Sequence, residues 1–127
     1  MNVTSAQLAQ IAGGRPDKSN INSIVVALDE YGPKTGLDKS HRLAQFLAQL
    51  AHESGGFKYD REIWGPTAAQ RGYEGRKDLG NTVKGDGKKF AGRGPIQLTG
   101  RGNVTRFHKW CVAEGLDPPD FIKTPVL

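Results

Sequence analysis

The chain has 127 residues, of which 36% are hydrophobic and 24% charged, a balance that excludes wholesale disorder. This length suits one domain with a real core. The single cysteine excludes an intrachain disulfide framework, and no apolar run approaches the roughly 20 residues needed to span a bilayer. Because residues 1–14 lack the basic and apolar regions of a standard signal peptide, we expect a soluble protein made in the cytoplasm.

Charge and glycine are both concentrated in one part of the chain. Residues 71–109 hold ten basic and three acidic residues, a net charge of +7, whereas the remainder carries −2. Such a field attracts polyanions, although a solvated loop with spare lysines would have the same count. Twelve of the 17 glycines fall between Gly55 and Gly102. A long irregular stretch inside a compact domain usually serves function.

Two helices are predicted in the first third of the chain. Thr4 and Gln7 have the spacing of a capping box, which predicts a short helix over 5–12 that ends at Gly13-Gly14. The next helix is expected to end at Gly32-Pro33. Its candidate caps are Ser19, Asn20 and Asn22, and its apolar stripe consists of Ile21, Ile24, Val25, Leu28 and Tyr31.

A third helix has the strongest periodicity in the chain, and Asp38 or Ser40 can cap it. It is expected to end at Gly55-Gly56, and its stripe consists of Leu43, Phe46, Leu47, Leu50 and Ala51. No period survives from there to about residue 94. A fourth helix is predicted over 103–114, and its apolar face is expected to be Phe107, Trp110 and Cys111. The pattern predicts a mainly α domain with a long structured loop between helices.

Glu53 lies at the end of the third predicted helix and shares its apolar stripe. Partial desolvation and the helix C-terminus would both raise the pKa of this carboxyl, as a general acid requires. A glutamate that reaches solvent from the edge of the stripe is the alternative. Asp60, Glu62 and Glu74 follow. Two carboxylates flanking a cleft are the minimum set for glycoside hydrolysis.

Other chemistries have weaker support in the sequence. His52-Glu53 begins like a zinc-protease helix, but no second histidine follows four residues later. The three histidines are too scattered for a metal site. Phosphate-binding loops and a G-x-S-x-G nucleophile motif are absent. We therefore expect neither a metal nor a cofactor.

Four segments together resemble a known family. They are AHESGGF (51–57), REIWGPTAAQRGYEGRKDLGN (61–81), GDGKKF (85–90) and FAGRGPIQLTGRGN (90–103). From about Leu43 to Asn103 the chain is similar to glycoside hydrolase family 19 chitinases, and more closely to the phage and prophage endolysins of that superfamily. The resemblance implies a lysozyme-like, two-lobed helical domain whose long Gly-rich loop region lines the cleft.

The resemblance also implies roles for individual residues. Glu53 matches the general acid, and the second carboxylate falls on Glu62 in the endolysin pattern or on Glu74 in the plant chitinase pattern. Of these two, Glu62 is preferred. Thr99 would orient the attacking water. The expected substrate-binding or bracing residues are Gln97, Asn103, Arg93 and Glu74. The aromatic rings of Trp64 and Tyr73 are expected to bind substrate as sugar-stacking platforms.

The function implied is an inverting, peptidoglycan-cleaving β-1,4-glycosidase of the endolysin type, with 1–127 as one catalytic domain. A lytic transglycosylase, a chitinase and a non-catalytic cell-wall-binding module are the alternatives. Two departures from the family pattern stand out: Val104 replaces a tyrosine, and the chain stops at Leu127, which predicts a C-terminally shortened domain.

Expectations for partners and location follow from the same resemblance. The substrate would be peptidoglycan, reached in the cell wall or periplasm after release with a holin-type partner. We expect a monomer without membrane insertion. No specific nucleic-acid binding is expected, since no helix-turn-helix, RNP or zinc-finger pattern accompanies the basic segment.

Overall fold

The computed structural model describes residues 2–124, and these residues are mainly helical, which confirms the predicted fold class. They form no strand, and two isolated β-bridges join Arg93 to Arg61 and to Leu98. Leu127, on which the predicted shortening rests, lies outside the described residues. The chain divides into two compact units, named here the N-terminal unit (Met1–Asp60) and the C-terminal unit (Arg61–Leu127). Within 2–124, none of the helices combines the length and apolarity needed to cross a membrane.

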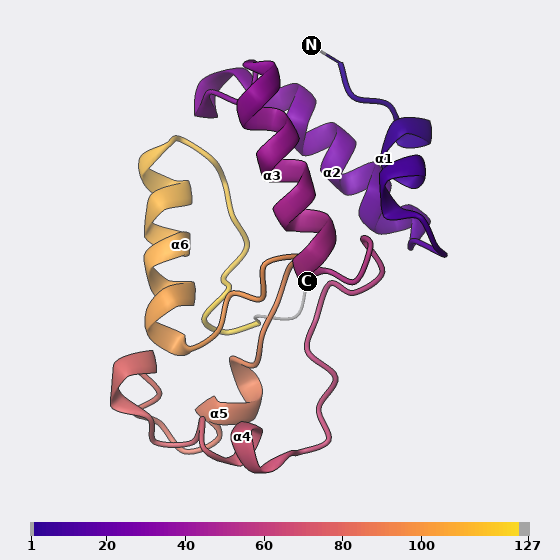
Figure 1. The fold of residues 1–127 in the computed structure, drawn as a ribbon. Coiled ribbons are helices and arrows are strands. Elements are labelled where there is room, and N and C mark those ends of the chain that lie inside the picture. The colour runs from indigo at the N-terminus through magenta and orange to yellow at the C-terminus, as the bar shows by residue number, and fades with distance from the viewer. Residues whose placement is uncertain (1, 125–127) are drawn as a thin grey trace. The chain divides into compact units, whose positions relative to one another are not determined.

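The N-terminal unit is a small helical bundle (Figure 1). Its elements are α1 (Ser5–Ala12), α2 (Lys18–Tyr31), the 3₁₀-helix η1 (Pro33–Thr35) and α3 (Ser40–Glu53). The bounds of α1 and its capping box of Thr4 and Gln7 agree with the prediction. The predicted caps of the next two helices are wrong. Asp17 caps α2 through the backbone N–H of Asn20, and α3 begins after Lys39 without a side-chain cap.

Packing of apolar side chains holds the N-terminal unit together. The core combines residues of all three α-helices with one from the following turn: Leu8, Ile21, Ile24, Leu43, Leu47, Leu50 and Phe57. The α3 stripe is confirmed at three of its positions, whereas Phe46 is 37% exposed. Ser54 ends α3, because its Oγ donates to the Leu50 carbonyl at 2.6 Å and accepts from the Phe57 N–H at 2.9 Å.

The C-terminal unit contains one long helix and several short ones. They are α4 (Ala68–Arg71), the 3₁₀-helix η2 (Lys77–Leu79), α5 (Asp86–Lys89) and α6 (Arg101–Ala113). Side-chain hydrogen bonds join these pieces. Asp86 is buried and accepts two bonds from the Arg101 guanidinium, at 2.7 and 2.8 Å. Asn81, also buried, accepts from the Arg101 N–H and donates to the Tyr73 carbonyl.

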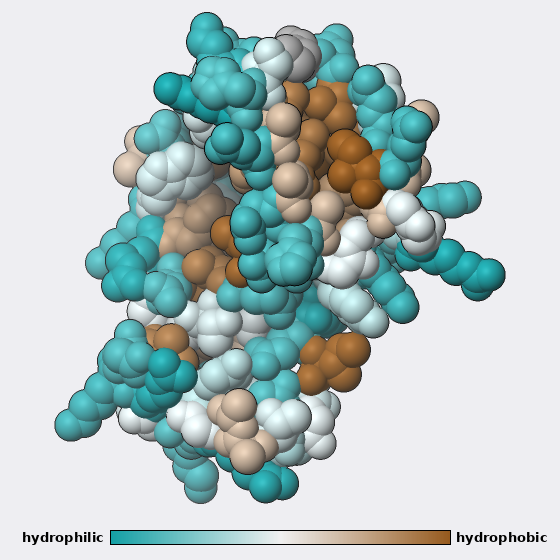
Figure 2. Space-filling model, viewed as in Figure 1, coloured by the Kyte–Doolittle hydropathy of each residue, from teal (hydrophilic) through white to brown (hydrophobic). Residues whose placement is uncertain are grey.

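The predicted apolar face of the last helix is wrong at two of its three positions. Cys111 is buried, as expected, and burial raises the pKa of its thiol. Phe107 and Trp110 are 44% and 48% exposed, and the second buried residue of α6 is Val104. The two exposed rings stack on each other, with centroids 6.2 Å apart. On the face shown in Figure 2, apolar residues form separate patches among hydrophilic ones.

Candidate active site

Glu62 is the most firmly held carboxylate among the predicted site residues. It is half-buried, and its backbone N–H donates to the Gly92 carbonyl at 2.8 Å. Three donors reach its carboxylate. Oε1 accepts from Gln70 Nε2 and from the Tyr73 hydroxyl, each at 3.1 Å, and Oε2 accepts from the Gly92 N–H at 2.9 Å. An ionised carboxylate offers only acceptors, so three donors suit that form.

Gln70 is a member of this site that the sequence analysis missed. It is 4% exposed and lies on the single turn of α4, where it closes a capping box with Thr67. Its Oε1 accepts from the backbone N–H groups of Gly65 and Thr67, at 3.0 and 2.8 Å. Its Nε2 donates to the Ile63 carbonyl at 2.8 Å as well as to Glu62. The Thr-x-x-Gln spacing of the capping box was the available signal.

Tyr73 and Trp64, both predicted to contact substrate, lie beside each other. Their ring centroids are 6.5 Å apart with the planes inclined at 42°. The Tyr73 hydroxyl is a donor to Glu62. Burial first, and then the hydrogen bond and charge of Glu62, raise the pKa of Tyr73, and the positive charge of Arg76 opposes them weakly. Tyr73 therefore remains protonated, and a donor, at neutral pH.

The GRGPIQLT turn joins Glu62 to the remaining predicted residues of the C-terminal unit. Arg93 exchanges two backbone hydrogen bonds with Leu98, and its Nη1 donates to the carbonyls of Ala91 and Gly92. Gln97 has a φ of 57°, and its side-chain amide donates to the Gly94 carbonyl at 2.8 Å. The arginine side chain is thus held against the backbone of the turn.

Thr99 and Asn103 continue from this turn into α6. The Thr99 hydroxyl donates to the Gln97 carbonyl at 2.8 Å, and the Asn103 amide donates to the Thr99 carbonyl at 2.7 Å. Asn103 also accepts from Arg106. Since the hydroxyl proton of Thr99 is engaged, its oxygen is available as an acceptor.

Glu74, the alternative second carboxylate, lies outside this network. It is exposed, and both of its carboxylate oxygens accept from the backbone N–H of Gly85, at 3.2 and 3.1 Å. Gly85 is the residue that precedes α5. Glu74 therefore holds the start of that short helix.

Glu53 belongs to the N-terminal unit, at the last residue of α3. The predicted desolvation is wrong, because the side chain is exposed and lies off the buried stripe. Its Oε1 accepts from Gln49 Nε2 at 2.8 Å, one helical turn earlier. The neighbouring Ser54 is buried, and so is Phe57 at the end of the motif, so the motif fixes the backbone beside Glu53 and leaves the carboxylate in solvent.

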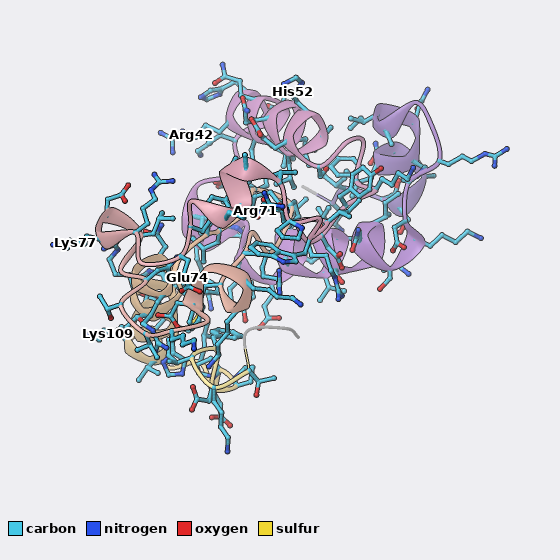
Figure 3. All side chains as sticks on the ribbon, turned by 90° about the horizontal axis from the view of Figure 1, so that it is seen from below. Arg42, His52, Arg71, Glu74, Lys77 and Lys109 are labelled. Atoms are coloured by element: carbon cyan, nitrogen blue, oxygen red, sulfur yellow. The ribbon has the colours of Figure 1, made fainter. Side chains whose placement is uncertain are left out.

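The basic segment is exposed in the C-terminal unit. Of its ten basic side chains, eight are exposed and two, Arg93 and Arg101, are half-buried. Figure 3 labels Arg71, Lys77 and Lys109 among the exposed ones. Arg76 forms an ion pair with Asp78, with Nη2 and Oδ2 2.8 Å apart. Most of the positive charge thus remains available to an anionic polymer.

Comparison with known proteins finds similar ones, among them a glycosyl hydrolase domain protein and an endochitinase. A glycosyl hydrolase family 19 domain-containing protein of Haemophilus influenzae is 30% identical to this chain, and the match covers 79% of this chain and 63% of the relative. An endochitinase of Arabidopsis thaliana is 29% identical, over 91% of this chain and 39% of the relative. The chain is thus similar to a protein named for a glycosyl hydrolase family 19 domain and to an endochitinase. It spans less than two thirds of either relative, and neither a family model nor a solved structure matches it.

The names of both relatives agree with the family that the sequence motifs resemble. Within the C-terminal unit, hydrogen bonds link six of the predicted site residues, either directly or through Gly92 and Gly94. These residues are Glu62, Tyr73, Arg93, Gln97, Thr99 and Asn103.

Proposed function

We propose that the protein is a glycoside hydrolase that cleaves β-1,4 bonds between the amino sugars of peptidoglycan. The observation that carries the proposal is the Glu62 carboxylate, which accepts three hydrogen bonds inside a chain similar to a glycosyl hydrolase family 19 domain-containing protein. A general base must be ionised and correctly oriented to take a proton from water. Three donors on Glu62 fix the orientation of its carboxylate.

Glu53 is assigned as the general acid. This role comes from the family motif at 51–57, and the exposure of the side chain leaves it accessible to a sugar. The family resemblance implies an inverting reaction, in which the acid protonates the leaving oxygen and the base activates a water on the opposite face of the sugar. Thr99 would help to hold that water through its hydroxyl oxygen.

The exposed basic residues of 71–109 favour peptidoglycan over neutral chitin as the substrate. Peptidoglycan and its associated polymers are anionic, so a positive surface would raise their concentration near the site. In this proposal the protein acts as a monomeric endolysin of phage or prophage type, on the cell wall or periplasm. A holin-type partner would give it passage, and neither specific nucleic-acid binding nor membrane insertion is part of its action.

Digestion of purified peptidoglycan, with mass spectrometry of the released fragments, tests the proposal. We expect muropeptides with hydrated reducing ends from the wild type and none from Glu53→Gln. The matched control is Glu30→Gln, which changes an exposed glutamate of α2 and should digest like the wild type.

Other products would identify the alternatives. Anhydro ends would indicate a lytic transglycosylase, and release restricted to chito-oligosaccharides would indicate a chitinase. Pelleting with peptidoglycan without any released fragment would overturn the enzymatic proposal in favour of a binding module. Equal digestion by Glu53→Gln and wild type would overturn the assignment of the acid.

A further inference from the structure

We propose that Gln70 and Tyr73 are positioning residues for Glu62. They occupy its Oε1 and leave Oε2 as the atom that takes the proton from the attacking water. This inference rests on the proposed hydrolase function and adds to it two residues and one reactive atom. It also gives Tyr73 a role different from the sugar platform predicted from the sequence.

The distribution of donors over the carboxylate distinguishes its two oxygens. Each carboxylate oxygen has two lone pairs. Oε1 receives two donors, Gln70 Nε2 and the Tyr73 hydroxyl, and its acceptor capacity is filled. Oε2 receives one, the Gly92 N–H. One acceptor position therefore remains on the carboxylate, and it lies on Oε2.

Gln70 is held so completely that its amide has one possible orientation. The two backbone N–H groups of Gly65 and Thr67 point at its Oε1, which must therefore be the oxygen. The nitrogen then faces the Ile63 carbonyl and Glu62. All four hydrogen-bonding positions of the amide are used, and a buried, satisfied amide of this kind is rigid.

Tyr73 is fixed at its ring and at its backbone. The ring lies against Trp64, and the backbone carbonyl accepts from the buried Asn81 at 2.9 Å. Asn81 in turn accepts from the first N–H of α6. The hydroxyl is thereby aimed at Glu62 by contacts with Trp64, which precedes Tyr73 in the chain, and with Asn81, which follows it. Supporting hydrogen bonds of this kind hold a reactive group in its productive geometry.

With these assignments, hydrolysis of the glycosidic bond requires two proton transfers. The water oxygen bonds to the anomeric carbon while one of its protons passes to Glu62 Oε2. The glycosidic C–O bond breaks, and the leaving oxygen takes the proton of Glu53. One water is consumed, and exchange with solvent returns the two carboxyls to their starting protonation states.

Kinetics of Tyr73→Phe on peptidoglycan fragments test the inference, with Tyr31→Phe on α2 as the matched control. Removal of the hydroxyl takes one donor from a charged acceptor, which we expect to lower kcat about tenfold while KM stays unchanged. The acidic limb of the pH–rate profile should move to higher pH, because a carboxylate with fewer donors is protonated more readily. If Tyr73 had a purely structural role, neither kcat nor the pH–rate profile would change once rates are normalised to the amount of folded protein.

A second variant tests the other donor, and circular dichroism shows whether each variant is folded. Gln70→Glu keeps an oxygen for the two backbone N–H groups but replaces the donor to Glu62 with a second carboxylate oxygen, and it should also lower kcat. Unchanged kcat and pH profile in Tyr73→Phe, beside an active wild type, would overturn the inference alone. A wild type that cleaves neither peptidoglycan nor chito-oligosaccharides would overturn the proposed function and this inference with it.

Discussion

Different interactions stabilise the interior of each of the two units. In the N-terminal unit, the buried cluster consists of aliphatic side chains and Phe57, and its α-helices pack through them. In the C-terminal unit, three buried side chains are polar or charged, namely Gln70, Asn81 and Asp86. Each of them bonds to segments distant in sequence or to neighbouring backbone. The first unit is stabilised mainly by non-directional burial, and the second depends on directional hydrogen bonds.

This difference suits the chemistry proposed for each unit. Directional bonds fix atoms within the tolerances that a catalytic group needs, and Glu62 is held by such bonds. Glu53 lies at the end of a well-packed helix, where its side chain is exposed. The C-terminal unit therefore has the more demanding geometry and, with few regular elements, the greater sensitivity to single polar substitutions.

The largest effect is expected from loss of the buried ion pair. Asp86→Ala leaves the Arg101 guanidinium without its carboxylate, and we expect the free energy of unfolding of the C-terminal unit to fall by about 3–5 kcal/mol. Chemical denaturation measures this change in the free energy of unfolding. Asp78→Ala, which removes an exposed ion pair with Arg76, is the control and should change little. Similar losses in both variants would refute a special role for the buried pair.

A core truncation in the N-terminal unit should come next. Leu47→Ala removes a buried side chain of α3, with an expected cost of about 3 kcal/mol. Amide hydrogen exchange should accelerate in α1–α3, since this cluster holds those helices together. The adjacent Phe46→Ala, at a partly exposed position, should cost less. If exchange were to accelerate only in α6, the two units would not be stabilised separately.

The smallest of the three effects is a dependence on pH. Hydrogen bonds from Arg101, and secondarily from the Val83 N–H, hold the pKa of Asp86 below its ordinary range despite burial. A lowered pKa contributes stability above the unfolded-state value of about 3.9, and this contribution disappears as pH falls through the folded-state value. Denaturation midpoints of the wild type should therefore fall more steeply below about pH 4 than those of Asp86→Asn. If the midpoints of the two proteins fell in parallel with pH, the stabilising role of the Asp86 carboxylate would be contradicted.

The N-terminal unit could be predicted from the sequence because periodicity encodes it. The spacing of Leu43, Leu47 and Leu50 and the capping box at Thr4 are local patterns, and both are confirmed. Caps chosen from several candidate polar residues were wrong, since Asp17 rather than its neighbours reaches the free N–H groups. Local propensity alone does not rank such candidates.

The network around Glu62 could not be predicted from spacing, because its bonds join residues 8 to 30 positions apart. The motif resemblance assigned Glu62 as the second carboxylate and left out Gln70, and aromatic chemistry assigned Tyr73 to sugar stacking. Exposure of Glu53, Phe107 and Trp110 also ran against the helical pattern. A stripe shows which residues could face a core, but tertiary packing decides how far that core extends.

Glutamine substitution of the two candidate bases tests the central claim, that Glu62 is the second catalytic carboxylate, most directly. Initial rates of muropeptide release would be compared for wild type, Glu62→Gln and Glu74→Gln, with circular dichroism confirming that each is folded. We expect Glu62→Gln to lose about 10²-fold or more in rate and Glu74→Gln to stay within a few-fold of wild type. A folded Glu62→Gln that retains wild-type rates, beside an inactive Glu74→Gln, would contradict the claim.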